Sequence, residues 1–220
     1  AYTLATAAEN GTLRILLSKP IRRWEVLLGT LGGIVVYLWL VALASMLLAA
    51  TMLHALAETS AAALGEGVFR AAPANLLYAL FVAFVMGAIG VSLSVFTTDR
   101  LRTGLLALPV PLLYVMGLPI RIFSGSRYEE YYLWIVDLNY QFGNAFVAIH
   151  EAVGGQLSPE TQHAVGLWTG VYDFVAADEV PAEPVDPVGY VSPEVSLVAL
   201  CLLSAGLVVA AAYRFHRMDI

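Results

Sequence analysis

Four long stretches without a charged side chain constrain the fold of this chain more than any other feature. They cover residues 26–57, 71–98, 103–120 and 195–213. A helix needs about 20 apolar residues to cross the hydrocarbon core of a bilayer, and one Asp, Lys or Arg at its centre costs roughly 2.5–3.5 kcal/mol. We therefore predict an all-α, polytopic membrane bundle with four transmembrane helices. Pro109, Pro111 and Pro119 each remove a backbone donor, so we expect the third helix to be irregular.

The composition of the 220 residues agrees with a membrane protein and excludes several other classes. Hydrophobic residues make up 60% of the chain and charged residues 13%, whereas about a quarter of the residues in an ordinary globular protein are charged. The single cysteine, Cys201, argues against an internal disulfide and a cysteine metal site. The net charge of −6 argues against nucleic acid as a partner, because binding phosphates requires a basic surface.

The chain begins with eight uncharged residues and without a methionine. This run is too short to span a membrane, and it lacks the basic start of a signal peptide. It is interpreted either as the end of a transmembrane helix that begins upstream or as a frayed apolar terminus.

The basic residues predict the orientation in the membrane. If the four helices alternate in direction, eight of the 11 Lys and Arg residues lie on one side with four acidic residues, and three lie on the other side with 13 acidic residues. The eight are Arg14, Lys19, Arg22, Arg23, Arg100, Arg102, Arg214 and Arg217. Because basic residues concentrate in cytoplasmic loops, we predict that both ends of this chain are cytoplasmic and that the acidic region 121–194 is external.

Residues 121–194 are too numerous for a simple loop. They begin with aromatic residues of the kind found at the level of lipid headgroups, namely Tyr128, Tyr131, Tyr132 and Trp134. We expect an interfacial or partly re-entrant helix over residues 135–146. Ser158, followed by proline and an acid, predicts the start of a second short helix that runs through Trp168. Residues 178–187 alternate acid and proline, which predicts a linker.

Residues 9–29 carry the most informative local pattern. Leu13, Leu16 and Leu17 share one helical face while Arg14 remains polar, so we expect a short amphipathic helix. Pro20 disfavours its continuation, and a new helix near Ile21 is expected to run into the first transmembrane segment. On this pattern alone, the segment either lies on anionic lipid of the inner leaflet or docks on a protein.

The same residues resemble a known family. Residues 9–29 are similar to a segment in permease subunits of the ABC-2 transporter family, including the subfamily of the nitrous-oxide-reductase maturation permease. Residues 11–25 match the family pattern G-T-L-x-x-L-L-S-x-P-[IV]-x-R-x-E, whereas one residue separates Glu9 from Gly11 and the family pattern E-x-x-G has two. Residues 138–144 (LNYQFGN) and 213–220 (YRFHRMDI) resemble family patterns before and after the last membrane span. The family usually has six spans, so the resemblance implies two further helices before residue 1 in the intact protein.

The resemblance implies a coupling helix that docks in a groove of a separate cytosolic ABC ATPase. The docking residues expected from it are Glu9, Gly11, Thr12, Leu13, Arg14, Leu16, Leu17, Pro20 and Arg23. The chain contains no G-x-x-x-x-G-K-[ST] phosphate loop. We therefore expect no enzyme activity and no cofactor in this chain, with ATP and Mg bound by the ATPase partner. The other expected partners are a second permease copy, in a homodimer or a heterodimer, and membrane lipid.

Motifs for chemistry within the chain are weak. His54 and Glu58 lie one turn apart, and His150-Glu151 lacks the second histidine of a metalloprotease motif. No catalytic, cofactor-binding or metal-binding residue is therefore predicted. The glycines of two spans predict close helix packing, within the bundle or across a dimer interface; they are Gly29, Gly32, Gly33, Gly87 and Gly90.

These observations predict the membrane-spanning subunit of an ABC exporter in the cell membrane. Its expected parts are 1–25 with the coupling helix, 26–120 with three spans, the external region 121–194, and 195–220 with the last span. Two alternatives remain open. One is an ATPase-linked module that transmits force to an extracellular partner without transport, and the other is a lipid-surface membrane protein without an ATPase.

Overall fold

A computed structural model describes Thr12 and residues 22–56, 59–97, 99–154, 157–173 and 183–217. Every regular element in these residues is a helix, and they contain no strand. The chain divides into two compact units, one formed by residues 1–107 and 202–220 and the other by residues 108–201. The all-α fold expected from the sequence is confirmed.

Within the described part of the chain, four helices are long and apolar enough to cross a membrane. They are Arg23–Leu56, Ala61–Thr97, Leu101–Ser124 and Pro193–Arg217. Each contains most of one of the uncharged stretches, so the four predicted transmembrane helices are confirmed. All four extend past the uncharged residues at one end or both, because a charged side chain at a helix end can reach the interface while the backbone remains helical.

The third of these helices is interrupted, as its prolines predict. Helix α6 (Arg100–Ala107) ends before Leu108, and α7 (Pro109–Ser124) begins directly after it. Pro109 lies at the first position of α7 and Pro111 in its first turn, where a missing backbone N–H leaves no helical hydrogen bond unmade. Pro119 lies inside α7. The interruption is therefore at the first proline, and the other two are accommodated.

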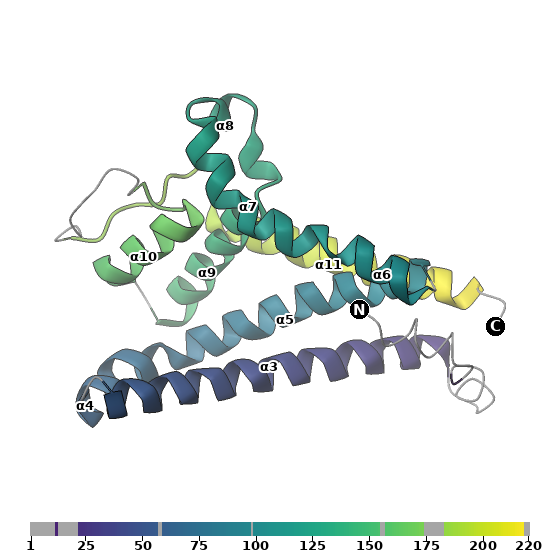
Figure 1. Ribbon diagram of the computed structural model, residues 1–220, viewed down its shortest axis with the longest axis horizontal. Helices are drawn as coiled ribbons and strands as arrows, with labels where there is room; N and C mark the ends of the chain where they lie inside the picture. The colour runs from purple at the N-terminus through teal and green to yellow at the C-terminus, as the bar shows by residue number, and fades with distance from the viewer. Residues whose placement is uncertain are drawn as a thin grey trace. The chain divides into compact units, whose positions relative to one another are not determined.

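In the first unit, α3 (Arg23–Leu56) and α5 (Arg70–Thr97) run side by side (Figure 1). A short α4 (Ala61–Leu64) and a π-helix, η1 (Gly65–Phe69), lie between them in the chain. Trp39 Nε1 of α3 donates a hydrogen bond to the Leu76 carbonyl of α5 at 3.0 Å. A Cβ atom at Gly87 would lie 3.0 Å from the Leu31 side chain, so the predicted close packing at this glycine is confirmed.

The glycines of α3 differ from Gly87. Nothing in the described residues lies within 4 Å of a Cβ atom built at Gly29, Gly32 or Gly33. Among the described residues, no other helix therefore packs closely against these three glycines.

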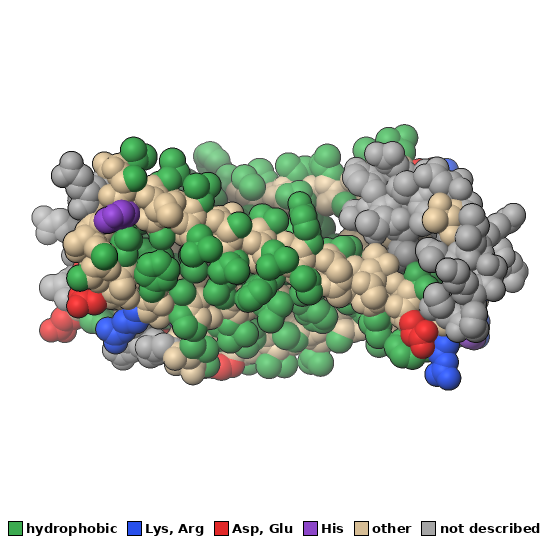
Figure 2. Space-filling view, turned by 90° about the horizontal axis from the view of Figure 1, so that it is seen from below, with side chains coloured by type: hydrophobic (Ala, Val, Ile, Leu, Met, Phe, Trp, Pro, Cys, Tyr) green, Lys and Arg blue, Asp and Glu red, His purple; other side chains and the backbone are tan. Residues whose placement is uncertain are grey.

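The outer face of α3 is apolar rather than polar. Tyr37 is 66% exposed and Leu48 is 61% exposed, and in the described part of the face in Figure 2 most of the coloured side chains are hydrophobic. A soluble protein rarely exposes a continuous apolar surface of this kind. The surface is that of a helix in contact with lipid.

The second unit contains α7 together with α8 (Arg127–Glu130), the 3₁₀-helix η2 (Leu133–Ile135), α9 (Leu138–Gly154) and α10 (Pro159–Thr169). Helix α9 is its core, and the most buried side chains of the core include Tyr140, Val147, Val171 and Tyr172. The helix expected over residues 135–146 is thus present, but it begins at Leu138 and continues to Gly154. The chain bends through η2 before it.

The second short helix predicted within residues 121–194 is confirmed as a helix. The Ser158 hydroxyl accepts a hydrogen bond from the Thr161 N–H at 3.4 Å, and Pro159 is the first residue of α10. The helix ends at Thr169, one residue after the expected end, and Gly170 follows in the left-handed conformation with φ of 70°. Residues 183–189 contain no helix, as expected for a linker, and residues 178–182 of that linker lie outside the described residues. The last helix, α11, covers Pro193–Arg217.

Candidate coupling site

Two of the nine predicted docking residues belong to the described part of the chain. Thr12 is helical and exposed, and Arg23 is the first residue of α3. The others lie outside the described residues; they are Glu9, Gly11, Leu13, Arg14, Leu16, Leu17 and Pro20. The structure therefore describes the start of the membrane helix that follows the predicted coupling segment in the sequence, and of the segment before Arg22 it describes Thr12 alone.

Helix α3 has a capped start. The Glu25 carboxylate accepts a hydrogen bond from the Arg22 backbone N–H at 3.1 Å, and the Arg22 carbonyl accepts one from the Glu25 N–H at 2.9 Å. A glutamate that binds back to the residue before the helix is one half of a capping box. The new helix expected near Ile21 begins at Arg23, which confirms that prediction within the usual uncertainty of a helix end.

Arg23 joins the start of α3 to the end of α11. Its Nη1 atom donates hydrogen bonds to the Phe215 carbonyl at 3.0 Å and to the His216 carbonyl at 3.2 Å. Carbonyls in the last turn of a helix have no partner within the helix, and a cation placed there also interacts favourably with the helix dipole. One side chain thus connects residues that are 192 positions apart in the sequence.

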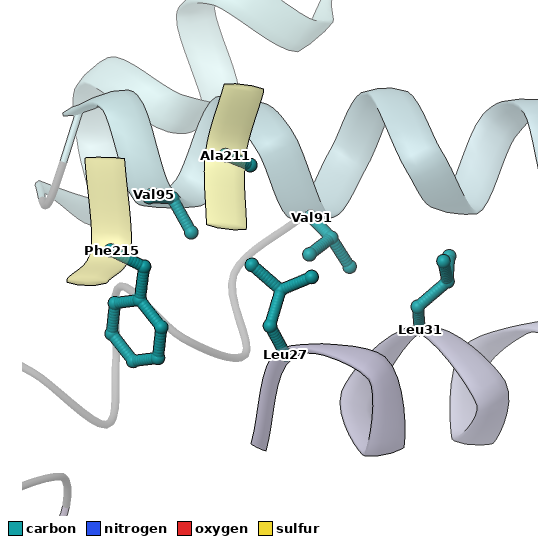
Figure 3. Close-up of a cluster of buried hydrophobic side chains, with 6 residues drawn as sticks. All are labelled: Leu27, Leu31, Val91, Val95, Ala211 and Phe215. Atoms are coloured by element: carbon teal, nitrogen blue, oxygen red, sulfur yellow. The ribbon is translucent and has the colours of Figure 1, made fainter. Parts of the chain in front are cut away.

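An apolar cluster lies next to this contact. It takes two side chains from each of three helices, namely Leu27 and Leu31, Val91 and Val95, and Ala211 and Phe215 (Figure 3). Leu27 and Ala211 are completely buried, and Phe215 is 2% exposed. We refer to Arg23 and these six residues as the Arg23 joint. A displacement of the start of α3 has to be accommodated by both α5 and α11, because their side chains share this cluster.

The surroundings of the Arg23 joint are basic. Asp99 caps α6, with its Oδ1 atom accepting hydrogen bonds from the N–H groups of Leu101 at 2.8 Å and Arg102 at 3.1 Å. The Arg214 guanidinium lies 6.0 Å from the centre of the Phe96 ring. At the ends of the helices α3, α5, α6 and α11 that flank the joint, the structure describes two acidic side chains, Glu25 and Asp99. It describes five arginine side chains there, namely Arg22, Arg23, Arg102, Arg214 and Arg217.

A second polar site lies in the second unit, and we refer to it as the Arg121 clamp. The Asp137 side chain is fully buried, and its Oδ2 atom accepts hydrogen bonds from Arg121 Nη1 at 2.7 Å and from the Tyr128 hydroxyl at 2.8 Å. Its Oδ1 atom accepts one from the Tyr140 N–H at 3.1 Å, which caps the start of α9. Arg121 Nη2 also donates to the Trp168 carbonyl at 2.6 Å. The clamp thereby connects α7, α8, α9 and α10.

The surroundings of the Tyr128 hydroxyl in the clamp keep its proton in place. Burial raises the pKa of the Tyr128 hydroxyl well above its usual range, and the negative charge of Asp137 and its hydrogen bond to the hydroxyl raise that pKa further. Tyr128 therefore remains a donor to Asp137 throughout the physiological range of pH. Two glycines leave room for the charged side chains of the clamp. A Cβ atom at Gly170 would lie 2.6 Å from Arg121 Cδ, and one at Gly117 would overlap Asp137 Oδ1.

The sequence analysis did not identify the clamp. Asp137 directly precedes the helical run that starts at Leu138, and an aspartate at that position is a usual helix cap. That signal predicts the cap but not its partner, because Arg121 is 16 residues away across a bend.

The two histidine motifs form ordinary contacts with the backbone. Nδ1 of His54 lies 2.7 Å from the Thr59 carbonyl, and Nδ1 of His150 lies 2.9 Å from the Phe146 carbonyl. Glu58 lies outside the described residues. In the part of the chain that the structure describes, no three His, Cys, Asp or Glu side chains are grouped so that they could hold a metal ion.

Comparison with known proteins identifies the family. Residues 2–220 match the ABC-2 family transporter protein domain. A search of curated proteins and a search of solved structures found no significant match. The family match includes both the Arg23 joint and the Arg121 clamp, and members of this family are membrane transport subunits. The chain therefore belongs to the ABC-2 transporter family, as a multi-pass membrane protein and the permease component of an ABC transporter.

Proposed function

We propose that this chain is the permease of an ABC exporter and that a cytosolic ATPase, which binds ATP and Mg, docks on residues 9–23. The observation that carries the proposal is the Arg23 joint. The predicted docking segment leads directly into α3, whose first residue binds the last turn of α11. A push at the start of α3 would reach three helices through the cluster around Leu27. Closure of the ATPase on nucleotide would supply that push.

The proposed orientation places the Arg23 joint on the cytoplasmic side. The first unit has nine basic and six acidic residues, and the second has two basic and 11 acidic residues. The excess of arginine at the joint and of acid in the second unit, where every acidic residue falls within 121–194, supports cytoplasmic ends and an external region 121–194. The working exporter would contain two permeases, identical or different, and two ATPases.

The proposed subfamily is that of the nitrous-oxide-reductase maturation permease, and residues 9–29 support it. The presence of two further helices before residue 1 stays a prediction, which the sequence of the gene upstream will test.

A second candidate function is force transmission to an extracellular partner without transport. The compact acidic second unit favours it, because the Arg121 clamp ties α8, α9 and α10 to the end of the third membrane span, α7. Stimulation of ATPase activity by a transported substrate supports the exporter. Stimulation only by an external protein supports force transmission.

Docking and lipid adsorption use the same segment differently, so one substitution separates them. Adsorption depends on charge, at about 1 kcal/mol per basic residue near an anionic surface. Docking buries the leucine face, where a charged replacement costs roughly 2 kcal/mol or more. We expect Leu16→Asp to leave the protein in the membrane and to abolish co-purification with the ATPase, whereas Arg22→Gln weakens co-purification slightly. Normal co-purification of a folded Leu16→Asp variant would show that the ATPase docks elsewhere.

A second pair of variants tests the joint separately from docking. Phe215→Ala removes a buried ring from the cluster, and Tyr213→Ala removes an exposed ring from the same helix. Phe215→Ala should retain the ATPase but reduce the stimulation of its activity by substrate. Tyr213→Ala should leave both unchanged. Equal coupling in the two variants would show that the cluster does not transmit the movement.

A further inference from the structure

The turn between α8 and α9 exposes apolar side chains on a rigid support. In residues 131–136, which we call the aromatic turn, Tyr131 is 62% exposed, Tyr132 63%, Ile135 58% and Val136 62%. None of the six residues is charged. Neither the Arg23 joint nor the Arg121 clamp accounts for this surface.

The backbone of the aromatic turn is largely satisfied by its own chain. The N–H groups of Tyr131 and Tyr132 donate to the carbonyls of Arg127 and Glu129, each at 3.0 Å. The N–H of Ile135 donates to the Tyr132 carbonyl at 3.0 Å, and those of the next two residues donate to the Leu133 carbonyl at 3.1 Å. A segment that leaves water for lipid has to satisfy its backbone groups internally. Four N–H groups of the turn, and that of Asp137 directly after it, meet that condition.

The turn is held in shape from its inner side. The Trp134 ring stacks on the Tyr190 ring, with the planes 8° apart and the centres 6.5 Å apart. Gln141 Nε2 donates a hydrogen bond to the Trp134 carbonyl at 2.8 Å. Tyr132 has a φ of 53°, and no other non-glycine residue in the described part of the chain has a positive φ. A non-glycine backbone kept in this unfavourable conformation indicates that the surrounding structure determines the shape of the turn.

The position of the aromatic turn in the chain indicates what lies against its exposed side chains. The membrane-spanning helix Leu101–Ser124 ends seven residues before Tyr131, and Phe123 in its last turn is 87% exposed. Tyrosine and tryptophan next to the end of a membrane helix concentrate at the boundary between headgroups and acyl chains, because one end of the side chain is apolar and the other is polar. Exposed apolar side chains therefore lie both at the end of the span and in the turn, and the exposed charged residues Arg127, Glu129 and Glu130 stand between them in the chain.

We propose that the aromatic turn inserts into the lipid boundary at this end of the third span and fixes the depth of the second unit in the membrane. The occupant of the surface is lipid, with Tyr131 and Tyr132 at the headgroups and Ile135 and Val136 deeper. The proposal does not depend on the identity of the transported substrate or on the docking site of the ATPase.

Fluorescence from a single label tests the proposal in the full chain. In a Cys201→Ser background, Val136→Cys carries an environment-sensitive fluorophore, and the protein is placed in phosphatidylcholine–phosphatidylglycerol vesicles. Glu160→Cys, at an exposed position on α10, is the matched control. The label at residue 136 should emit at shorter wavelength than the control, lose intensity to a quencher attached to lipid acyl chains, and resist iodide in water. Tyr131→Cys provides a second labelled position. Its label should also be quenched more by the lipid-attached group and less by iodide than the label of the control.

Two outcomes would overturn the proposal. Quenching by iodide that equals the control at both positions would place the turn in water. Protection from iodide without quenching by the lipid-attached group, or protection that disappears when the protein is diluted in lipid, would show that a protein surface covers the turn instead.

Discussion

Two arginines, each at the end of a membrane helix, bind the last turn of another helix in very different surroundings. Arg23 binds the carbonyls of Phe215 and His216 next to a cluster of aliphatic and aromatic side chains. Arg121 binds the Trp168 carbonyl and also the fully buried carboxylate of Asp137. The same type of contact is therefore combined with apolar packing in one unit and with a buried charge in the other.

The difference indicates which part of the molecule can move. Apolar contacts have no preferred direction but are close-packed, so the six side chains of the Arg23 joint can pass a small shift from one helix to the next without breaking a directional contact. Hydrogen bonds to a buried carboxylate weaken steeply when their geometry changes, and a buried charge left without partners is strongly unfavourable. The joint is suited to transmit a small displacement. The clamp is suited to keep the helices of the second unit in one arrangement.

The largest effect is expected from removing the buried charge. Asp137→Ala leaves the Arg121 guanidinium without its carboxylate and removes the cap of α9, and breaking a buried pair in this way costs about 3–5 kcal/mol. The loss is measured as the difference in the free energy of unfolding between the wild type and the variant in detergent. The double variant Arg121→Met/Asp137→Ala should recover part of the loss, because neither charge is then left unpaired. A loss for Asp137→Ala below about 1 kcal/mol would show that the clamp is open to water.

A pair of identical substitutions tests the packing of the two units. A Cβ atom at Gly143 in α9 would lie 2.5 Å from Thr169 Cβ and 2.8 Å from Val171 Cγ2, whereas nothing described lies within 4 Å of one at Gly33 in α3. Gly143→Ala should therefore cost about 1–3 kcal/mol. Gly33→Ala should leave stability unchanged or raise it by up to about 1 kcal/mol, because alanine favours the helix. Equal losses in the two variants would mean that Gly33 contacts another protein surface.

The membrane helices were predictable from the sequence because one property determines them. The stretch 71–98 has no charge, and α5 follows it from Arg70 to Thr97. The cost of charge in a bilayer is large and local, so length and composition are enough. The start of α10 was predictable for a similar reason, since Ser158 and Pro159 act within a single helical turn.

The contacts between helices were not predictable, because no local pattern specifies them. The sequence placed Arg23 in the docking segment, but its hydrogen bonds to Phe215 and His216 depend on where a helix about 190 residues later ends. The pairing of Arg121 with Asp137 depends in the same way on the bend through η2. Residues 135–146 were expected to be one helix, and the bend was missed because Leu133, Trp134 and Ile135 show no turn signal such as glycine or proline.

A smaller effect is expected at the Arg23 joint. Arg23→Gln removes the positive charge at the end of α11, but the apolar cluster remains, so the loss should be about 1 kcal/mol. Unfolding measured as for Asp137→Ala gives the comparison, and Arg23→Lys should lose less because it retains a cation near the carbonyls. A loss as large as that of Asp137→Ala would contradict the view that packing dominates this site.

The smallest effect is a dependence on pH that arises in the second unit. Burial lowers the pKa of His150 in α9, and the hydrogen bond to the Phe146 carbonyl only partly opposes this. A histidine whose pKa is lower in the folded state than in the unfolded state favours folding when it is neutral. Its contribution is complete above the unfolded value of about 6.5 and is lost as the pH falls through that value towards the folded one. The unfolding temperature should therefore fall between about pH 7.5 and about pH 5.5 more in the wild type than in His150→Gln, when each protein is compared with itself at the higher pH. If both proteins show the same change, His150 takes up its proton as readily in the folded unit as in the unfolded chain, and the interior around α9 is open to water in a way that the joint and the clamp are not.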